Sequence, residues 1–441
     1  MREPGKVSMY VCGPTVYDLP HVGHGRAVLT YDVLRRVLEW TGIEVVHVSN
    51  ITDIDDKIIQ RANELGEDPA ALARRYEDEW FSAMDRLDVL RPTASPRATD
   101  YVEGMVDLIE RFLKEGSAYE TKDSVLLSVD SVPDYGLLAH QDLAMLRTTE
   151  RVGDDAFEDK RNPLDFVLWK KAKPGEPTWP APWGAGRPGW NTECVVMSLD
   201  LLGEGFDLHA GGLDLKFPHH ENERAQAVAM GKEFAMHWMH HAFIVADDGE
   251  KMSKSLGNFT SLTDLLDRVD PRAYRMLLLQ AHYRSPVQVS PVTIAAAEAS
   301  LAGLDALARR AGGAGLDTQA MSASAAALAE FRALLEDDLK TAQALSKVFE
   351  WVRLANIALD DGERLEAGRL VSRVLAATSA VGLVLHDGTS DLDPVAEALA
   401  KAREAARVAR NWSEADRLRD ELAALGWRVE DAKTGSLLVR I

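Results

Sequence analysis

Cysteine is scarce in this chain, which has two among 441 residues, Cys12 and Cys194. Two cysteines so far apart cannot form the disulfide framework of a secreted protein, so we expect a cytoplasmic location. Long apolar runs are also missing, because no uninterrupted stretch approaches the length of a membrane span. The first residues lack the apolar core of a signal peptide. We therefore expect no membrane partner.

Basic residues are outnumbered by acidic ones, 50 against 70, which gives a formal net charge of −20. This balance favours solubility and argues against nonspecific binding to nucleic acids or membranes. A nucleic-acid partner could still dock on locally basic surface. Residues 401–440 provide such a region, with nine Lys or Arg against seven Asp or Glu.

The N-terminal half has the pattern of a Rossmann-type α/β fold. Residues 7–12 predict a buried strand, 24–40 a helix and 45–48 a second strand. This βαβ succession is typical of nucleotide-binding domains. Residues 206–209 predict a returning strand followed by a glycine turn at 210–212, and residues 242–246 predict another strand.

The length of the chain predicts two to four domains. A segment of mixed character at about 95–185 is interpreted as an insertion in the first domain. After residue 292 alanine and leucine dominate, and the pattern is helical to about residue 385. The last residues predict two helices, divided at 411–413, and a hairpin. We therefore expect an α/β nucleotide-binding domain at 1–292, a helical domain at 293–388 and a small domain at 389–441.

Two segments carry residues suited to phosphate chemistry. His21 and His24 lie where a helix begins, and free backbone N–H groups at such a position bind phosphate. Lys251 and Lys254 lie in a loop at 251–255 with glycines on both sides. Two lysines in such a loop suit a polyphosphate leaving group. Taken singly, the first segment could equally be an ordinary polar helix start, and a loop like the second is more often a solvated surface loop.

The two cysteines suggest a metal site. Residues 219–223, His-His-Glu-Asn-Glu, add a histidine and a carboxylate one helical turn apart. Two thiolates with such a pair could hold one zinc ion. The alternative is that Cys12 and Cys194 are two small buried hydrophobic residues.

The segment with His21 and His24 and the segment with Lys251 and Lys254 resemble the HIGH and KMSKS signatures of class I aminoacyl-tRNA synthetases. They occur in the same order as in that class. Longer stretches resemble the cysteinyl-tRNA synthetase family through nearly the whole chain; they include residues 9–18, 50–57, 159–170, 184–193, 211–223 and 251–259. The resemblance implies ATP-dependent ligation of L-cysteine to tRNA(Cys) through a cysteinyl-adenylate. It also implies that the catalytic domain is followed by a helical domain and an anticodon-binding domain, and we expect a monomer.

The resemblance further implies that zinc is bound by Cys12, Cys194, His219 and Glu223. His219 and Glu223 are four residues apart and share a helix face, whereas His220 would point about 100° away if the stretch is helical. The thiol of the substrate could complete this site, whereas serine and alanine lack a soft sulfur ligand. No editing domain is then needed.

Other roles are implied by the same resemblance. The ATP-binding and catalytic residues would be His21, His24, Lys251 and Lys254, with Mg²⁺ accompanying ATP. The residues around the substrate would be Thr52, Trp190, His209 and Asp214, with Trp190 closing over the side chain and Asp214 pairing with the ammonium group. The residues that contact anticodon bases would be Arg407, Trp412, Asp416 and Asp431.

Several of these residues have a purely structural alternative. Trp190 and Trp412 could be buried aromatic residues. Ser413 with Asp416 resembles a helix-capping arrangement. Thr52 precedes an acidic run that could be a solvated helix start.

The chain departs from the family pattern in three places. Asn191 stands where histidine is usual, Ala210 stands where glycine is usual, and the strand pair that usually precedes the Met9 segment is missing. One rival function is the ligase that joins cysteine to an amino sugar in mycothiol synthesis, which has no anticodon module. A second rival is a non-catalytic tRNA-binding paralogue. A zinc hydrolase is disfavoured because no HExxH arrangement occurs.

Overall fold

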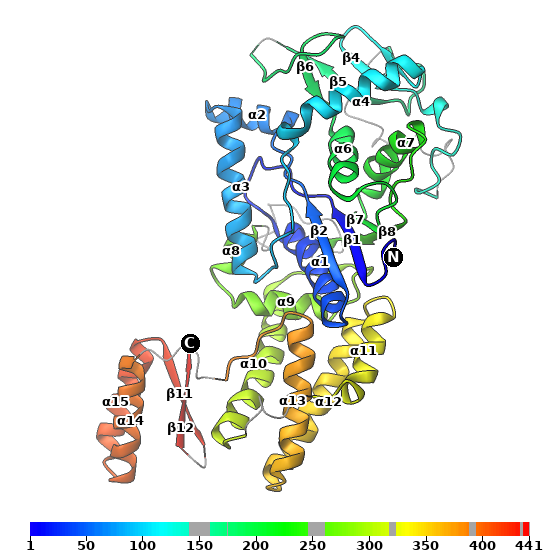
Figure 1. Ribbon diagram of the computed structural model, residues 1–441. Coiled ribbons are helices and arrows are strands. Elements are labelled where there is room, and N and C mark those ends of the chain that lie inside the picture. Colours follow the sequence, from blue (N-terminus) through cyan, green and yellow to red (C-terminus); the bar gives the residue numbers. More distant parts are fainter. Residues whose placement is uncertain are drawn as a thin grey trace. The chain divides into compact units, whose positions relative to one another are not determined.

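The computed structural model describes residues 1–140, 159–173, 175–245, 261–316, 323–387, 394–432 and 435–440 (Figure 1). The chain divides into two compact units. The first comprises Met1–Pro271 with Tyr283–Pro291, and the second comprises Arg272–His282 with Val292–Ile441. The predicted domain boundaries near residues 292 and 388 stay predictions.

A parallel four-stranded sheet of order β2-β1-β7-β8 organises the first unit (Figure 1). Its strands are β1 (Lys6–Val11), β2 (Glu44–Ser49), β7 (Leu208–Gly212) and β8 (His237–His241). Helix α1 (Val22–Trp40) connects β1 to β2, so the predicted βαβ unit is confirmed. In such sheets ligands bind at the carboxyl ends of the strands, which is where Cys12 and Asn50 follow β1 and β2.

The segment interpreted as an insertion contributes a second, antiparallel sheet of order β3-β4-β5-β6. These strands and the helices around them bury one large apolar core that includes Phe112, Trp169 and Phe206. The strands of this sheet and the remaining helices of the first unit are α2 (Asp56–Leu65), α3 (Pro69–Arg86), α4 (Val102–Glu115), β3 (Ala118–Glu120), β4 (Ser124–Leu127), β5 (Phe166–Lys171), β6 (Gly186–Pro188), α6 (Trp190–Leu202), α7 (Glu221–Ala229) and α8 (Leu262–Leu266).

The strand predicted at 242–246 is largely wrong. The strand that joins the parallel sheet is β8, five residues earlier, and the predicted region contains only the two-residue β9 (Ile244–Val245). Strand β9 pairs with β10 (Val287–Gln288) instead. The sequence of β8 is rich in histidine, which hides its strand character from a pattern based on apolar residues.

The second unit is mainly helical, as predicted. Its helices are α9 (Pro271–Leu279), α10 (Pro291–Gly313), α11 (Ala329–Glu336), α12 (Thr341–Asp360), α13 (Arg364–Ala380), α14 (Pro394–Val408) and α15 (Trp412–Ala424). The predicted terminal hairpin is confirmed as β11 (Trp427–Ala432) and β12 (Gly435–Arg440), which pair antiparallel. Ala396, Leu422 and Trp427 form a small core of their own beside it.

One described helix, α10, meets the length and composition of a membrane span. Such a helix is weak evidence for a membrane, because core helices of soluble proteins pass the same test. Its buried face includes Asp305, which receives two hydrogen bonds from the Arg272 guanidinium, at 3.1 and 3.0 Å. We therefore interpret α10 as a core helix of the second unit.

His47 in β2 links the burial of the parallel sheet to the pH dependence of folding stability. Its side chain is buried, and neither ring nitrogen has a hydrogen-bond partner among the described residues. Burial lowers the pKa of His47 to about 4. The unfolded chain therefore takes up a proton between about pH 6.5 and 4 that the folded chain resists, so folding stability falls as the pH falls through this window.

We expect His47→Phe to reduce this acid sensitivity. At pH 5 the protonation of His47 in the unfolded state costs the wild type about 2 kcal/mol. Urea unfolding at pH 7 and pH 5 should therefore show a stability loss that is smaller by about this amount in the variant. An equal loss in both proteins would contradict the pKa direction given for His47.

Candidate metal centre and nucleotide site

The four predicted metal ligands meet at the carboxyl end of β1. Cys12 directly follows β1, Cys194 lies in α6, His219 lies in the turn Lys216–His220, and Glu223 lies in the first turn of α7. Their candidate ligand atoms all lie within 4.8 Å of one another. Segments more than 180 residues apart in sequence are thus brought together by the sheet.

The spacing of these atoms is close to that of a tetrahedron. The two Sγ atoms are 3.8 Å apart, Cys12 Sγ is 3.7 Å from Glu223 Oε1, and Cys194 Sγ is 3.7 Å from His219 Nε2. His219 Nε2 is 3.0 Å from Glu223 Oε1. Around tetrahedral zinc, neighbouring sulfur, nitrogen and oxygen ligands lie about 3.3 to 3.8 Å apart. The three separations that involve sulfur are of this size, whereas the His219–Glu223 separation is about 0.3 Å shorter than the range. The donor set therefore fits zinc in its chemistry, and in its spacing once His219 and Glu223 move slightly apart.

Burial controls the protonation of these ligands. Burial raises the pKa of the Cys12 thiol well above its ordinary value. A hydrogen bond with Cys12 lowers the pKa of the Cys194 thiol, but burial and the nearby Glu223 carboxylate outweigh it and the pKa is raised. Burial lowers the pKa of His219 to about 4, so the imidazole is neutral at pH 7. Neutral imidazole is the form that binds metals.

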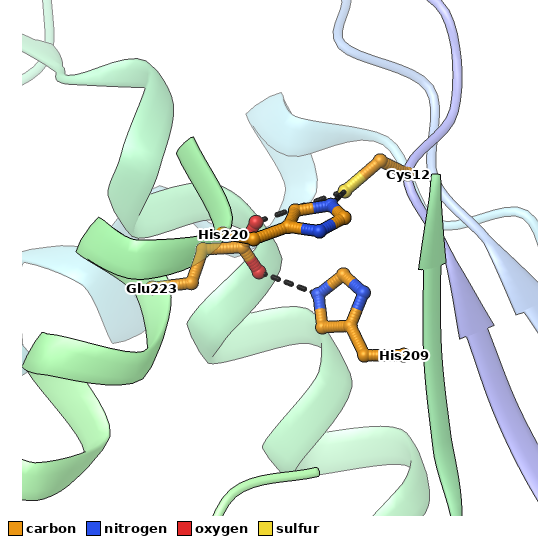
Figure 2. A group of neighbouring side chains, drawn as sticks. All are labelled: Cys12, His209, His220 and Glu223. Atoms are coloured by element: carbon orange, nitrogen blue, oxygen red, sulfur yellow. Dashed lines mark hydrogen bonds and ion pairs between the residues drawn. The ribbon is translucent and has the colours of Figure 1, made fainter. Parts of the chain in front are cut away.

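A second donor set overlaps the first. Figure 2 shows the side chains of Cys12, His209, His220 and Glu223 converging on one point. Cys12 Sγ is 3.3 Å from His220 Nε2, and His209 Nε2 is 2.7 Å from Glu223 Oε2. The latter distance is that of a direct hydrogen bond, about half an ångström too short for two ligands of one zinc ion.

The ring nitrogens that face away from the cluster, the Nδ1 atoms, also distinguish the two candidate ligand sets. A histidine that binds a metal usually donates its other N–H to an oxygen. His209 Nδ1 is buried and has no hydrogen-bond partner among the described residues, whereas His219 Nδ1 lies 2.9 Å from Asn191 Oδ1. The arrangement favours the set with Cys194 and His219, and gives His209 the role of a hydrogen-bond partner for Glu223.

The prediction that His220 points away from the cysteines is wrong. The backbone of His220 is helical, and the one extended residue of the turn, Phe217, precedes both histidines. His220 nevertheless contacts the cluster, because its Nε2 lies 3.3 Å from Cys12 Sγ while His219 lies against Cys194. His220 Nδ1 lies 2.9 Å from His240 Nε2 in β8.

A buried hydrogen-bonded chain supports the cluster, and sequence reasoning missed two of its members, Asn50 and Glu193. Asn50 Oδ1 accepts the Gly13 N–H at 2.8 Å and lies 3.9 Å from Cys194 Sγ. Its amide Nδ2 donates to Thr52 Oγ1 at 3.2 Å, and the Thr52 hydroxyl donates to Glu193 Oε2 at 2.8 Å. Burial raises the pKa of Glu193. Both missed residues lie in stretches that carry the family resemblance.

Gly13 is needed for the close approach of these segments. A Cβ atom on Gly13 would lie 1.6 Å from the carbonyl oxygen of Asn50.

We expect Gly13→Ala to lower the free energy of unfolding by about 3 kcal/mol. The clash is between the backbone of residue 13 and the backbone of Asn50, so neither side can yield by a side-chain rotation, and Cys12 would be displaced. Gly303→Ala in α10 is the control: it meets no atom within 4 Å and should stabilise the helix by up to about 1 kcal/mol. Urea unfolding of both variants checks this, and equal stabilities would contradict it.

The residues predicted to surround the substrate differ in their burial. Thr52 and His209 are buried beside the cluster. Trp190 is 40% exposed, so it is not a core residue, and its indole stacks on the His219 imidazole with ring centres 3.9 Å apart. Asp214 is exposed in the turn after β7. Ala210 is buried within β7, and its carbonyl accepts the Cys12 N–H at 3.1 Å, so the sheet accommodates its Cβ atom.

The first nucleotide-binding segment forms the N-terminus of α1. His21 is the N-cap residue, and its Nδ1 accepts the His24 N–H at 3.2 Å; His24 Nδ1 in turn accepts the His21 N–H at 3.2 Å. The two rings stack with centres 3.6 Å apart. Because both Nδ1 atoms accept, each Nε2 carries the proton and is a donor. Lys251 and Lys254 lie outside the described residues.

Three of the four residues predicted to contact tRNA, namely Arg407, Trp412 and Asp416, lie around the α14–α15 turn. Trp412 is 60% exposed, which rules out the core alternative. Asp416 lies 3.3 Å from Arg419, and Arg407 lies 3.5 Å from Glu404. The capping alternative for Ser413 with Asp416 is also wrong, because Asn411 caps α15 by accepting the Glu414 N–H. Asp431 lies in β11, but its side chain is outside the described part of the chain.

Comparison with known families decides the affiliation. A model described as the class I (C) tRNA synthetase catalytic domain matches residues 1–299, and a DALR domain matches 330–385. The cysteinyl-tRNA ligase anticodon binding domain matches 389–436. The chain belongs to the cysteine–tRNA ligase family.

Curated cysteine–tRNA ligases are similar along nearly their whole length. The one from Carboxydothermus hydrogenoformans is 43% identical, over 98% of this chain and 95% of its own. The one from Azotobacter vinelandii is 44% identical, with the same coverage. The structure of Mycobacterium tuberculosis methionyl-tRNA synthetase with methionyl-adenylate has a TM-score of 0.61 at 17% identity and covers 85% of this chain and 89% of that one. This likeness confirms the class I catalytic fold predicted from the sequence.

Proposed function

We propose that the chain ligates L-cysteine to tRNA(Cys) in an ATP-dependent reaction, and that zinc bound by Cys12, Cys194, His219 and Glu223 selects the substrate. Family membership supports the ligase activity. The observation that supports the zinc assignment is the convergence of two thiols, an imidazole and a carboxylate within 4.8 Å of one another, with the Sγ atoms 3.8 Å apart.

Zinc would supply a Lewis-acidic position that favours a soft sulfur donor over the hydroxyl of serine. The residues around it hold the ligand-bearing segments in place. Asn50 bonds the Gly13 N–H and lies against Cys194, which holds the two cysteine-bearing segments together. Trp190, which is 40% exposed, stacks on the imidazole of the buried His219. A site completed by one substrate group rejects analogues that lack the group.

The adenylation step needs positioning and charge neutralisation rather than a protein nucleophile. The cysteine carboxylate would attack the α-phosphate of ATP, and pyrophosphate would leave. His21 and His24, whose Nε2 atoms are donors at the N-terminus of α1, would stabilise the charge that builds up on the phosphate. Lys251, Lys254 and an ATP-bound Mg²⁺ would do the same for pyrophosphate. The terminal ribose hydroxyl of tRNA would then take the cysteinyl group from the adenylate.

The C-terminal domain distinguishes this function from amino-sugar ligation. Residues 389–436 match an anticodon-binding domain, a module that the mycothiol-type ligase lacks. Trp412 exposes an aromatic face on which an unpaired base could stack. A cytoplasmic location suits an enzyme that charges tRNA and remains part of this proposal.

Cysteine-dependent ATP–pyrophosphate exchange by the zinc-replete protein, followed by tRNA(Cys) charging, tests the proposal. We expect exchange with cysteine, little with serine, one zinc per chain by elemental analysis, and charging of tRNA. No exchange would favour a non-catalytic tRNA-binding paralogue. Cysteinylation of an amino sugar but not of tRNA would favour the mycothiol-type ligase. Full activity in metal-free protein would refute the role of zinc.

A further inference from the structure

His219 is held on three sides by its neighbours. Asn191 Oδ1 lies 2.9 Å from His219 Nδ1. The indole of Trp190 stacks on the imidazole at an interplanar angle of 13°, and Glu223 Oε1 lies 3.0 Å from Nε2. The backbone carbonyl of Asn191 accepts a 2.8 Å hydrogen bond from Gln226 in α7, which ties the first turn of α6 to the helix that carries Glu223.

We propose that Asn191 is a positioning residue that selects the His219 tautomer with its Nε2 lone pair directed at the metal cluster. The inference rests on the proposed zinc site. A neutral imidazole carries one proton, and its two nitrogens here face competing acceptors, Asn191 Oδ1 at Nδ1 and Glu223 Oε1 at Nε2. When the Glu223 carboxylate binds zinc, Asn191 is the acceptor that holds the proton on Nδ1 and leaves Nε2 free to bind the metal. Nε2 is the nitrogen that lies 3.7 Å from Cys194 Sγ.

The contact between Asn191 and His219 differs from the contacts made by the Nδ1 atoms of His220 and His209. His220 Nδ1 faces His240 Nε2, a group that can be either donor or acceptor, and so does not select a tautomer by itself. His209 Nδ1 has no partner among the described residues. Within the described part of the cluster, only His219 has an amide oxygen on its outer nitrogen.

The amide of Asn191 has two faces, and this makes the proposal testable. Turned by 180°, it would present an N–H₂ donor to Nδ1 and select the opposite tautomer, which directs N–H at the cluster. A side chain that only accepts hydrogen bonds and a side chain that neither donates nor accepts them should therefore have opposite effects on zinc binding. Aspartate at position 191 can only accept when ionised, and leucine has a similar shape with no polar atom.

We expect Asn191→Leu to weaken zinc binding 10- to 100-fold, the usual effect of removing the outer partner of a metal-binding histidine, and Asn191→Asp to bind zinc at least as tightly as wild type. Competition with a chromogenic chelator measures both. The absorption spectrum of the Co²⁺-substituted protein gives an independent readout, because a displaced His219 changes the ligand field. Thermal unfolding of the zinc-free proteins shows whether each variant folds, and Asn191→Ala replaces Asn191→Leu if the latter does not.

Equal zinc affinity in wild type and in the variant without a polar group would overturn the proposal. So would an Asn191→Asp variant that binds zinc as weakly as Asn191→Leu, because the acceptor would then not be what matters. These outcomes are distinct from failure of the zinc site itself, which wild-type protein unable to bind zinc would reveal.

Discussion

Cys194→Ser is expected to lose zinc binding and cysteine-dependent ATP–pyrophosphate exchange together, each by more than about 100-fold. Removal of an outer partner alone costs 10- to 100-fold in affinity, and here one of four direct ligands is replaced by a weaker donor for zinc. Elemental analysis after gel filtration and exchange assays over a range of cysteine concentrations measure the two losses. A loss of exchange without a loss of zinc would separate substrate selection from metal binding.

The same variant separates the two overlapping donor sets. Cys194 belongs only to the set with His219, while His209 and His220 form the other set with Cys12 and Glu223. Zinc retained at full content in Cys194→Ser would show that our ligand assignment is wrong and would favour the alternative set. His219→Ala and His220→Ala serve as a matched pair, because we expect zinc loss only in the former.

His24→Asn is expected to lower ATP–pyrophosphate exchange by about 10² to 10³, the usual cost of removing one preorganised donor to a developing charge. The asparagine Oδ1 replaces Nδ1 as the acceptor of the His21 N–H, so the cap of α1 is retained while the Nε2 donor is lost. Zinc content should not change, because the rings of His21 and His24 are not part of the metal cluster.

His24→Gln is the control, since its amide nitrogen reaches toward the former Nε2 position, and it should retain more activity than His24→Asn. Burial lowers the pKa of His24 to about 3, so this residue stays neutral above pH 5 and should give no acid limb to the exchange rate. An Asn variant as active as wild type would remove His24 from the adenylation step.

Several features could be predicted from the sequence because they depend on local pattern. The βαβ unit at the N-terminus, the long helical segment and the terminal hairpin each carry their own periodicity and turn residues, and the structure confirms them. The strand β8 was missed because its five residues include three histidines, which apolar alternation does not register. Membership in the family followed from ordered motifs, which require no knowledge of contacts.

The sequence by itself determined which chemical groups this protein has for zinc, nucleotide and tRNA. Only the tertiary structure decided how those groups face one another: His220 lies against Cys12, Gly13 lies against the Asn50 backbone, and Asn191 lies at hydrogen-bond distance from Nδ1 of His219. The reason is that these contacts join segments from different strands and helices at one edge of a sheet. Their geometry depends on how those elements pack, and periodicity along the chain does not record it.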